Sequence, residues 1–391
     1  MSSESRNRYL LKNTLIFTLG NIGSRMISFF LIPLYTNVLT TSQYGTVDLI
    51  TTISTVAGPM LTLNIAESVM RFGLDKDADK EKNTQCGSIV LLIAMIIGLV
   101  LIPICRCITE VSDYAMYVYF YVISLSASQL FLCDLRGKEL LLKYSLGNIL
   151  QTLMIAILNI TFLLVFKMET GGYLLAYIIA NFIVAIYAII AGKGYKAFSF
   201  HNIDRCKLKE MIRYSVVLIP NTFMWWIMNS SDRVMVTYMI GAAANGIYAV
   251  SYKLPTLVST LTGIFNQAWS YSAIREEGTR DETEYNNKMF KTLSAIAFMM
   301  GIGLLLLTKP FLRVYVADSY YDAWKYTPFL IVGCVYLTLG TFMATSYTVH
   351  KDSFGYLFSG SFGAVFNILL NFILIPVIGV YGAALATILG L

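Results

Sequence analysis

Seven ionisable side chains stand inside long stretches of otherwise uncharged, apolar sequence, and they are the residues best placed to do chemistry. A charge buried in lipid costs at least a few kcal/mol, so such residues bind a substrate or ion, relay a proton or neutralise one another. Four of the seven are cations and three are acids, which predicts ion pairs with cations left over. The seven are Arg25, Asp48, Glu67, Arg71, Asp232, Arg233 and Lys253.

Spacing suggests partners for some of these charges. Glu67 and Arg71 are four residues apart with the acid first, the favourable order for an ion pair within one helix, so we predict a structural pair there. Asp232 and Lys253 lie about equally far from a turn expected near residues 242–243, which predicts that they lie side by side. Asp48 is close to the expected outer surface, where water would solvate it.

Arg25 and Arg233 have no obvious local partner, so we expect a cavity that suits an anion. Guanidinium groups bind phosphate through paired hydrogen bonds. For Arg25 an alternative stays open, in which backbone carbonyls accept its hydrogen bonds. Asn21 shares a helix face with Arg25, and Asn64 shares one with Glu67. The predicted substrate-binding set is Arg25, Arg233, Lys253, Asn21 and Asn64, and the coupling or structural ion-pairing set is Asp48, Glu67, Arg71 and Asp232.

We predict no catalytic residues, no metal and no bound cofactor. The chain has only two histidines, and its six cysteines form no CxxC pair and mostly lie in apolar stretches. Both features disfavour a zinc site. Coupling of transport to a proton gradient, a sodium gradient or the membrane potential stays open, because nothing in the sequence selects one of the acids for that role.

The elements that must hold these charges are transmembrane helices. The chain is 57% hydrophobic and 13% charged, whereas soluble domains carry about 25% charged residues. Its charge-free stretches reach the roughly 20 residues that a membrane-spanning helix needs, and they do not alternate as barrel strands do. We expect spans at 13–39, 46–71, 86–105, 114–134, 145–166, 171–192, 213–240, 245–272, 289–308, 326–349 and 354–376, with a last one beginning near Gly379.

The distribution of basic residues orients these spans. With the N-terminus in the cytoplasm, twenty Lys and Arg residues fall in inner segments and five in outer ones. Because cytoplasmic loops are enriched in basic residues, this predicts a multi-pass protein of the cytoplasmic membrane, surrounded by membrane lipids. The basic loops alternate regularly with apolar spans, which disfavours nucleic acid as a partner.

The two halves of the chain resemble each other. A shift of 201 residues places 38–47 on 239–248, with Gly45 on Gly246 in the turn between two long helices. An even number of helices in each half makes this a parallel repeat, as in transporters whose halves rock around a central site. We predict an N-terminal six-helix lobe at 1–192, a cytoplasmic linker at 193–213 and a C-terminal lobe at 214–391.

Three segments carry a resemblance to a known family. They are SDRVMVTYMIGAAANGIYAVSYKLP (231–255), NILLNFILIPVIGVYGAALAT (367–387), and FFLIPLYT (29–36) with QYG (43–45). The chain resembles the Wzx-type oligosaccharide flippases, the polysaccharide-biosynthesis branch of the superfamily that also holds MATE-like drug exporters and lipid II flippases. Members usually carry more sequence after the position of Leu391, so we expect the last helix, helix 12, to be truncated.

The resemblance implies an all-α integral membrane fold, with two six-helix lobes around a V-shaped central cavity that opens alternately to each side. It also implies a substrate, an undecaprenyl-pyrophosphate-linked glycan carried to the outer leaflet for cell-surface polysaccharide synthesis. Arg25, Arg233 and Lys253 would then hold the pyrophosphate. Other polysaccharide-assembly proteins are implied as partners.

Two other functions stay open. An organic-cation antiporter of the same fold would need unpaired carboxylates facing its cavity. A membrane glycosyltransferase or polysaccharide polymerase would need acidic catalytic residues in a large outer loop. The longest outer loop expected here, 309–325, has only Asp318 and Asp322. We interpret its aromatic residues Tyr320, Tyr321 and Trp324 as an interfacial belt.

Overall fold

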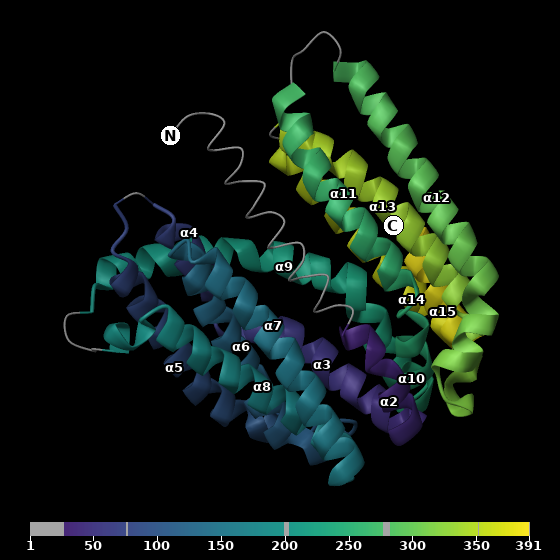
Figure 1. Ribbon diagram of the computed structural model, residues 1–391, viewed down its shortest axis with the longest axis horizontal. Helices are drawn as coiled ribbons and strands as arrows, with labels where there is room; N and C mark the ends of the chain where they lie inside the picture. Colours follow the sequence, from purple (N-terminus) through teal and green to yellow (C-terminus); the bar gives the residue numbers. More distant parts are fainter. Residues whose placement is uncertain (1–26, 76, 199–202, 277–281, 351, 391) are drawn as a thin grey trace. The chain divides into compact units, whose positions relative to one another are not determined.

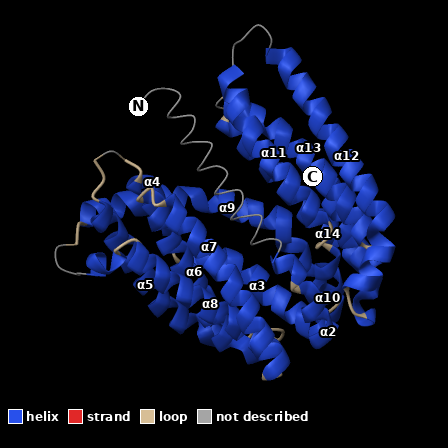
Figure 2. Ribbon diagram, viewed as in Figure 1, coloured by secondary structure: helices blue, strands red, loops and turns tan. Residues whose placement is uncertain are grey.

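The structure is a computed structural model that describes residues 27–75, 77–198, 203–276, 282–350 and 352–390. Throughout these ranges the regular elements are helices and there is no strand (Figures 1 and 2). The first unit of the chain, defined below, contains the larger part of α3 (Thr41–Leu61). It also contains α4 (Ile65–Gly73), α5 (Lys80–Arg106), η1 (Ser112–Tyr114), α6 (Ala115–Gly137), α7 (Leu141–Asn159), η2 (Ile160–Val165), α8 (Glu169–Ala191) and η3 (Gly194–Phe198).

The other elements are α2 (Ile32–Val38), α9 (Arg205–Met239), α10 (Ala242–Ser251), α11 (Pro255–Glu276), α12 (Glu282–Tyr315), η4 (Asp318–Lys325), α13 (Thr327–Val349), α14 (Ser353–Ile378) and α15 (Val380–Leu389). They belong to the second unit, except for the first half of α9 and the first residues of α2. Among the described helices, seven are long and apolar enough to cross a membrane, and the bent pair α3–α4 makes an eighth candidate. The expected all-α membrane fold is therefore confirmed.

Each expected span is mainly helical where its residues are described, and two of the spans are interrupted. The spans expected at 213–240 and 245–272 are the most polar of the set, and they correspond to α9 and to the pair α10 and α11. The span expected at 46–71 is two helices, because α3 and α4 meet at an angle of 61°. The span at 245–272 is likewise interrupted, at residues 252–254.

Contacts divide the chain into two compact units, which we call unit 1 and unit 2. Unit 1 contains residues 1–34 and 50–222, and unit 2 contains residues 35–49 and 223–391. The second half of the linker expected at 193–213 is helical, since α9 begins at Arg205 and continues into unit 2. The expected lobes differ from these units mainly at residues 35–49, which pack with the second half of the chain.

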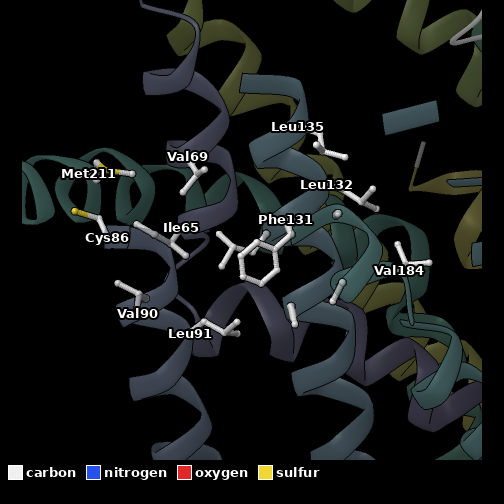
Figure 3. Packing of buried hydrophobic residues seen from close by; sticks show 14 residues of the cluster. Ile65, Val69, Cys86, Val90, Leu91, Phe131, Leu132, Leu135, Val184 and Met211 are labelled. Atoms are coloured by element: carbon white, nitrogen blue, oxygen red, sulfur yellow. The ribbon is translucent and has the colours of Figure 1, made fainter. Parts of the chain in front are cut away.

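Unit 1 is built around α6, which contacts α4, α5, α7 and α8. Its core is a cluster of buried apolar side chains contributed by these helices, with Phe131 near its centre and Val184 reaching in from α8 (Figure 3). Met211 of α9 is also a member of this cluster, and its backbone carbonyl accepts a hydrogen bond from the Ser68 hydroxyl (2.6 Å). This core fixes α4 and α6, the two helices that carry Glu67 and Gln129.

Unit 2 contains a close contact between two glycines that the sequence repeat had aligned. A Cβ at Gly45 would overlap the carbonyl oxygen of Ala242, and a Cβ at Gly246 would overlap that of Thr41. Since Thr41 and Ala242 are also related by the 201-residue shift, the contact is reciprocal, as expected for segments related by a two-fold axis. Only glycine permits this approach of α3 and α10.

The two helix breaks have identifiable backbone causes. Leu63 and Asn64 both have left-handed backbone angles, with φ of 52° and 54°, and they end α3 before α4 begins. Asn tolerates this conformation, whereas Leu does so only under constraint from its surroundings. The second break precedes Pro255, which lacks an N–H and suits the first turn of α11. Both breaks lie beside candidate site residues.

Candidate functional site

Four charged side chains gather in unit 2, and one ion pair joins two helices that are far apart in sequence. Arg233 of α9 places Nη1 3.3 Å from Oδ1 of Asp48 on α3, with side-chain exposures of 19% and 8%. The Arg233 guanidinium also lies over the ring of Tyr252, 4.6 Å from its centroid. The partner of Arg233 is therefore distant in sequence rather than local, and Asp48 forms an ion pair, one of the roles predicted for it, instead of being solvated by water. Folding brings the second half of the chain against residues 35–49.

Asp232 is held by hydroxyl groups. Its Oδ2 accepts hydrogen bonds from Tyr248 (2.7 Å), from Tyr252 and, at 3.3 Å, from Thr387 of α15. Its Oδ1 accepts from the backbone N–H of Arg233 at 2.9 Å. Among the described residues, polar donors rather than a cation thus satisfy this buried carboxylate.

The predicted pairing of Asp232 with Lys253 is wrong. The prediction assumed two straight helices leading away from a turn, but the chain leaves helical geometry between Ser251 and Pro255. Tyr248 and Tyr252, one turn apart at the end of α10, take the places beside Asp232. Lys253 is partly buried, and its charged neighbours are Asp48 and Arg233.

Lys253 is the one cation of this cluster for which the described residues provide no ion pair. Arg233 and Asp48 form the ion pair, and the hydroxyls satisfy Asp232. Asn245 adds hydrogen bonds from its Nδ2 to the Gly45 carbonyl (3.0 Å) and to Asp48 Oδ2 (3.3 Å). The Lys253 ammonium therefore remains the clearest candidate for contact with an anion.

The remaining predicted site residues divide between unit 1 and the undescribed N-terminus. Arg25 and Asn21 lie outside the described residues, so their predicted roles stay predictions. Asn64 and Glu67 line a cavity in unit 1. Arg71 pairs with Asp75 (2.6 Å) rather than with Glu67, because it lies in the last turn of α4, next to the turn that contains Asp75. The predicted Glu67–Arg71 pair is therefore wrong.

Several residues of these sites carry no charge and were missed in the sequence. In unit 2 they are Asn245, Tyr248, Tyr252 and Thr387. In unit 1 they are Gln129, Asn148, Gln151 and Asn221. One signal could have found part of the second set: Asn64 and Glu67, like Asn148 and Gln151, are three residues apart and so share a helix face within an apolar span.

The expected outer loop offers no carboxylate pair for catalysis among its described residues. Asp322 forms an ion pair with Lys325 at 3.0 Å, and this hydrogen bond raises the pKa of Lys325 above its ordinary value. Tyr320 is fully buried and donates a hydrogen bond to the Leu39 carbonyl (2.9 Å), so its assignment to an interfacial belt is wrong. Trp324 lies under the ammonium of Lys309.

The helical architecture and the charges held inside it define a class, the multi-pass membrane proteins with the fold of MATE transporters and lipid flippases. The lipid II flippase MurJ, in an inward closed conformation, is similar with a TM-score of 0.68 and 13% identity, over 96% of this chain and 85% of that one. An inward-facing multidrug resistance MATE family transporter of the MOP superfamily has a TM-score of 0.67 and 12% identity, over 94% and 91%.

A third similar structure is a MOP superfamily transporter from Pyrococcus furiosus, described as having a binding pocket of reverse polarity. Its TM-score is 0.60 at 14% identity, over 97% of this chain and 93% of that one. Among curated proteins, none is significantly similar in sequence. The sequence matches the family named polysaccharide biosynthesis protein over residues 10–271, and the chain belongs to that family.

Proposed function

We propose that this protein is a flippase that carries a lipid-pyrophosphate-linked oligosaccharide from the cytoplasmic to the outer leaflet of the cytoplasmic membrane, by alternating access. Family membership supports a role in polysaccharide synthesis. The carrier lipid is undecaprenyl pyrophosphate, the protein is not an enzyme, and the product serves other polysaccharide-assembly proteins. A proton gradient, a sodium gradient or the membrane potential supplies the coupling.

The observation that carries the substrate assignment is the state of the four charges in unit 2. Arg233 and Asp48 neutralise each other, and hydroxyls satisfy Asp232. Lys253 is then the one cation of this group that has no ion pair among the described residues, so its ammonium is the group that a pyrophosphate would contact. This assigns the anion contact to Lys253 and gives Arg233 a positioning role, with Arg25 as the further cation expected from the sequence.

The experiment is translocation in vesicles that contain the purified full chain and a fluorescent lipid-pyrophosphate-linked oligosaccharide. Lys253→Met should lower the translocation rate at least tenfold. Lys253→Arg should retain most of the wild-type translocation rate, because arginine keeps the positive charge. Lys325→Met is the matched control, since Lys325 is a partly exposed lysine of the same unit that pairs with Asp322. A Lys253→Met variant that folds normally and transports at the wild-type rate contradicts the assignment.

A second candidate, an organic-cation antiporter of the same fold, is favoured by one observation. Glu67 lines the unit 1 cavity, and no described ion pair includes it. An unpaired carboxylate could bind a cation. Uptake of ethidium into the same vesicles against an imposed proton or sodium gradient tests this candidate, and Glu67→Gln should abolish that uptake if the antiporter assignment holds.

A further inference from the structure

We propose that a cavity in unit 1 binds the sugar portion of the substrate, through a wall of carboxamide side chains; this inference rests on the proposed function. The cavity has a volume of about 770 Å³, and we call it the carboxamide cavity. Five Asn and Gln side chains line it, namely Asn64, Gln129, Asn148, Gln151 and Asn221.

These carboxamides come from four separate parts of unit 1. Asn64 precedes α4, Gln129 is on α6, Asn148 and Gln151 are on α7, and Asn221 is on α9. Gln129 is exposed although its neighbours Ser128 and Leu130 are buried, so its side chain faces the cavity rather than the core. Amide groups inside a membrane are costly unless water or a polar ligand satisfies them.

The chemistry of the wall matches hydroxyl groups. Each carboxamide offers a hydrogen-bond acceptor and two donors, and a sugar hydroxyl likewise donates and accepts. Part of this capacity is used inside the protein, since Gln151 Nε2 donates to Asn181 (2.7 Å) and Asn64 Nδ2 reaches Thr222 Oγ1 at 3.4 Å. These contacts hold two of the amides in place without consuming all of their donors and acceptors.

Two tyrosines complete the lining. Tyr144 of α7 lies near the guanidinium of Arg136, and Tyr214 of α9 packs edge to face on Phe72 at 5.7 Å between ring centroids. A pyranose ring presents apolar C–H faces that pack well on such aromatic rings. The volume falls within the roughly 300–1,000 Å³ of small-molecule sites.

The charge of the cavity separates the sugar from the pyrophosphate. None of the described lining residues is Lys, Arg or His, and Glu67 is the charged group among them. A carboxylate disfavours phosphate but accepts hydrogen bonds from sugar hydroxyls. The cavity therefore suits a neutral, hydroxyl-rich ligand.

The strained backbone at Leu63 and Asn64 supports a binding role for this wall. Left-handed conformations at residues other than glycine cluster at binding sites, where the surrounding structure holds them in place. Here the break turns α4 away from α3 and places Asn64 and Glu67 at the cavity. Asn64→Gly keeps the backbone conformation and removes only the carboxamide, so it separates the two roles.

Vesicle translocation with two lipids tests the inference. One lipid pyrophosphate carries the full oligosaccharide and the other carries a single sugar. Gln129→Met with Asn221→Leu should slow the first lipid at least tenfold and the second less than twofold. Asn229→Leu is the matched control, because Asn229 is also an exposed asparagine of α9 but lies outside the cavity. Equal effects on both lipids, or no effect on either, would overturn the inference.

Binding measured without transport separates this inference from the proposed function. The probe is a set of neutral oligosaccharides released from the producing cell's surface polysaccharide, mixed with the full chain in nanodiscs and observed by saturation-transfer NMR. We expect signals with the wild type that disappear in the Gln129→Met, Asn221→Leu and Asn64→Gly variants. No signal, a signal that the variants leave unchanged, or displacement by ethidium overturns the sugar site. Sugar binding without translocation would instead reject the proposed function alone.

Discussion

At the scale of single residues, the charges of unit 2 depend on one another through Asp48. This carboxylate contacts Arg233 and Asn245, and it is also a charged neighbour of Lys253. A buried charge that loses its partner is strongly destabilising, whereas removing both partners together is much less so. The Arg233–Asp48 pair should therefore behave as a structural unit.

Removing one partner of this pair should destabilise the protein. We expect Arg233→Met to cost about 3–5 kcal/mol, since it leaves Asp48 buried without its cation. Arg233→Met combined with Asp48→Asn should recover most of that loss. Thermal unfolding of the purified variants in detergent measures both effects. If the double variant is no more stable than Arg233→Met alone, the pair is not the unit we describe.

The same scale shows where reasoning from sequence was limited. Of the seven charges selected from the sequence, Asp48 and Asp232 are buried and Glu67, Arg233 and Lys253 are partly buried, whereas Arg71 is exposed and Arg25 lies outside the described residues. Two of the predicted pairs were wrong. The Glu67–Arg71 prediction failed because Asp75, just beyond the end of α4, takes Arg71 as its partner. The Asp232–Lys253 prediction failed because it assumed a straight helix through residues 252–254. The Arg233–Asp48 pair could not have been predicted from spacing, because 185 residues separate its members.

At the scale of elements, the contact between α3 and α10 depends on two glycines. Gly45 and Gly246 allow the backbones to touch, as small residues do at helix interfaces in membranes. Each glycine meets a carbonyl oxygen of the other helix, which cannot move aside as the end of a flexible side chain can.

Alanine at either position should force the two helices apart. We expect Gly45→Ala and Gly246→Ala each to lower the unfolding temperature markedly, with a loss of more than about 2 kcal/mol, comparable to overpacking a core. Gly303→Ala and Gly340→Ala are matched controls, because no atom lies within 4 Å of the added carbon in α12 or α13. These controls should be neutral or stabilising, by up to about 1 kcal/mol. Equal unfolding temperatures for all four variants would contradict the close contact.

At the scale of the whole molecule, the orientation predicted from the basic loops can be tested with native cysteines. Cys107 and Cys206 are both exposed, and the predicted topology places them on opposite sides of the membrane. In single-cysteine variants of the full chain, a membrane-impermeant maleimide added to intact cells should label Cys107. It should label Cys206 only after the cells are permeabilised. The reverse pattern would place the N-terminus outside.

The sequence by itself determined the class of the molecule and the positions of its helices. Hydropathy and charge act locally, because each span must satisfy its own backbone in lipid, so runs such as 86–105 and 171–192 correspond to α5 and α8. The family resemblance likewise rests on local segments, among them 231–255, and the family match covers that segment.

Only the tertiary structure decided which polar groups meet. It placed Asp48 with Arg233, surrounded Asp232 with hydroxyls and left Lys253 without an ion pair among the described residues. It also gathered five carboxamides from four parts of unit 1 into one cavity. The physical reason is that side-chain partners are set by helix breaks, rotation and packing between distant segments, and hydrophobic periodicity specifies none of these.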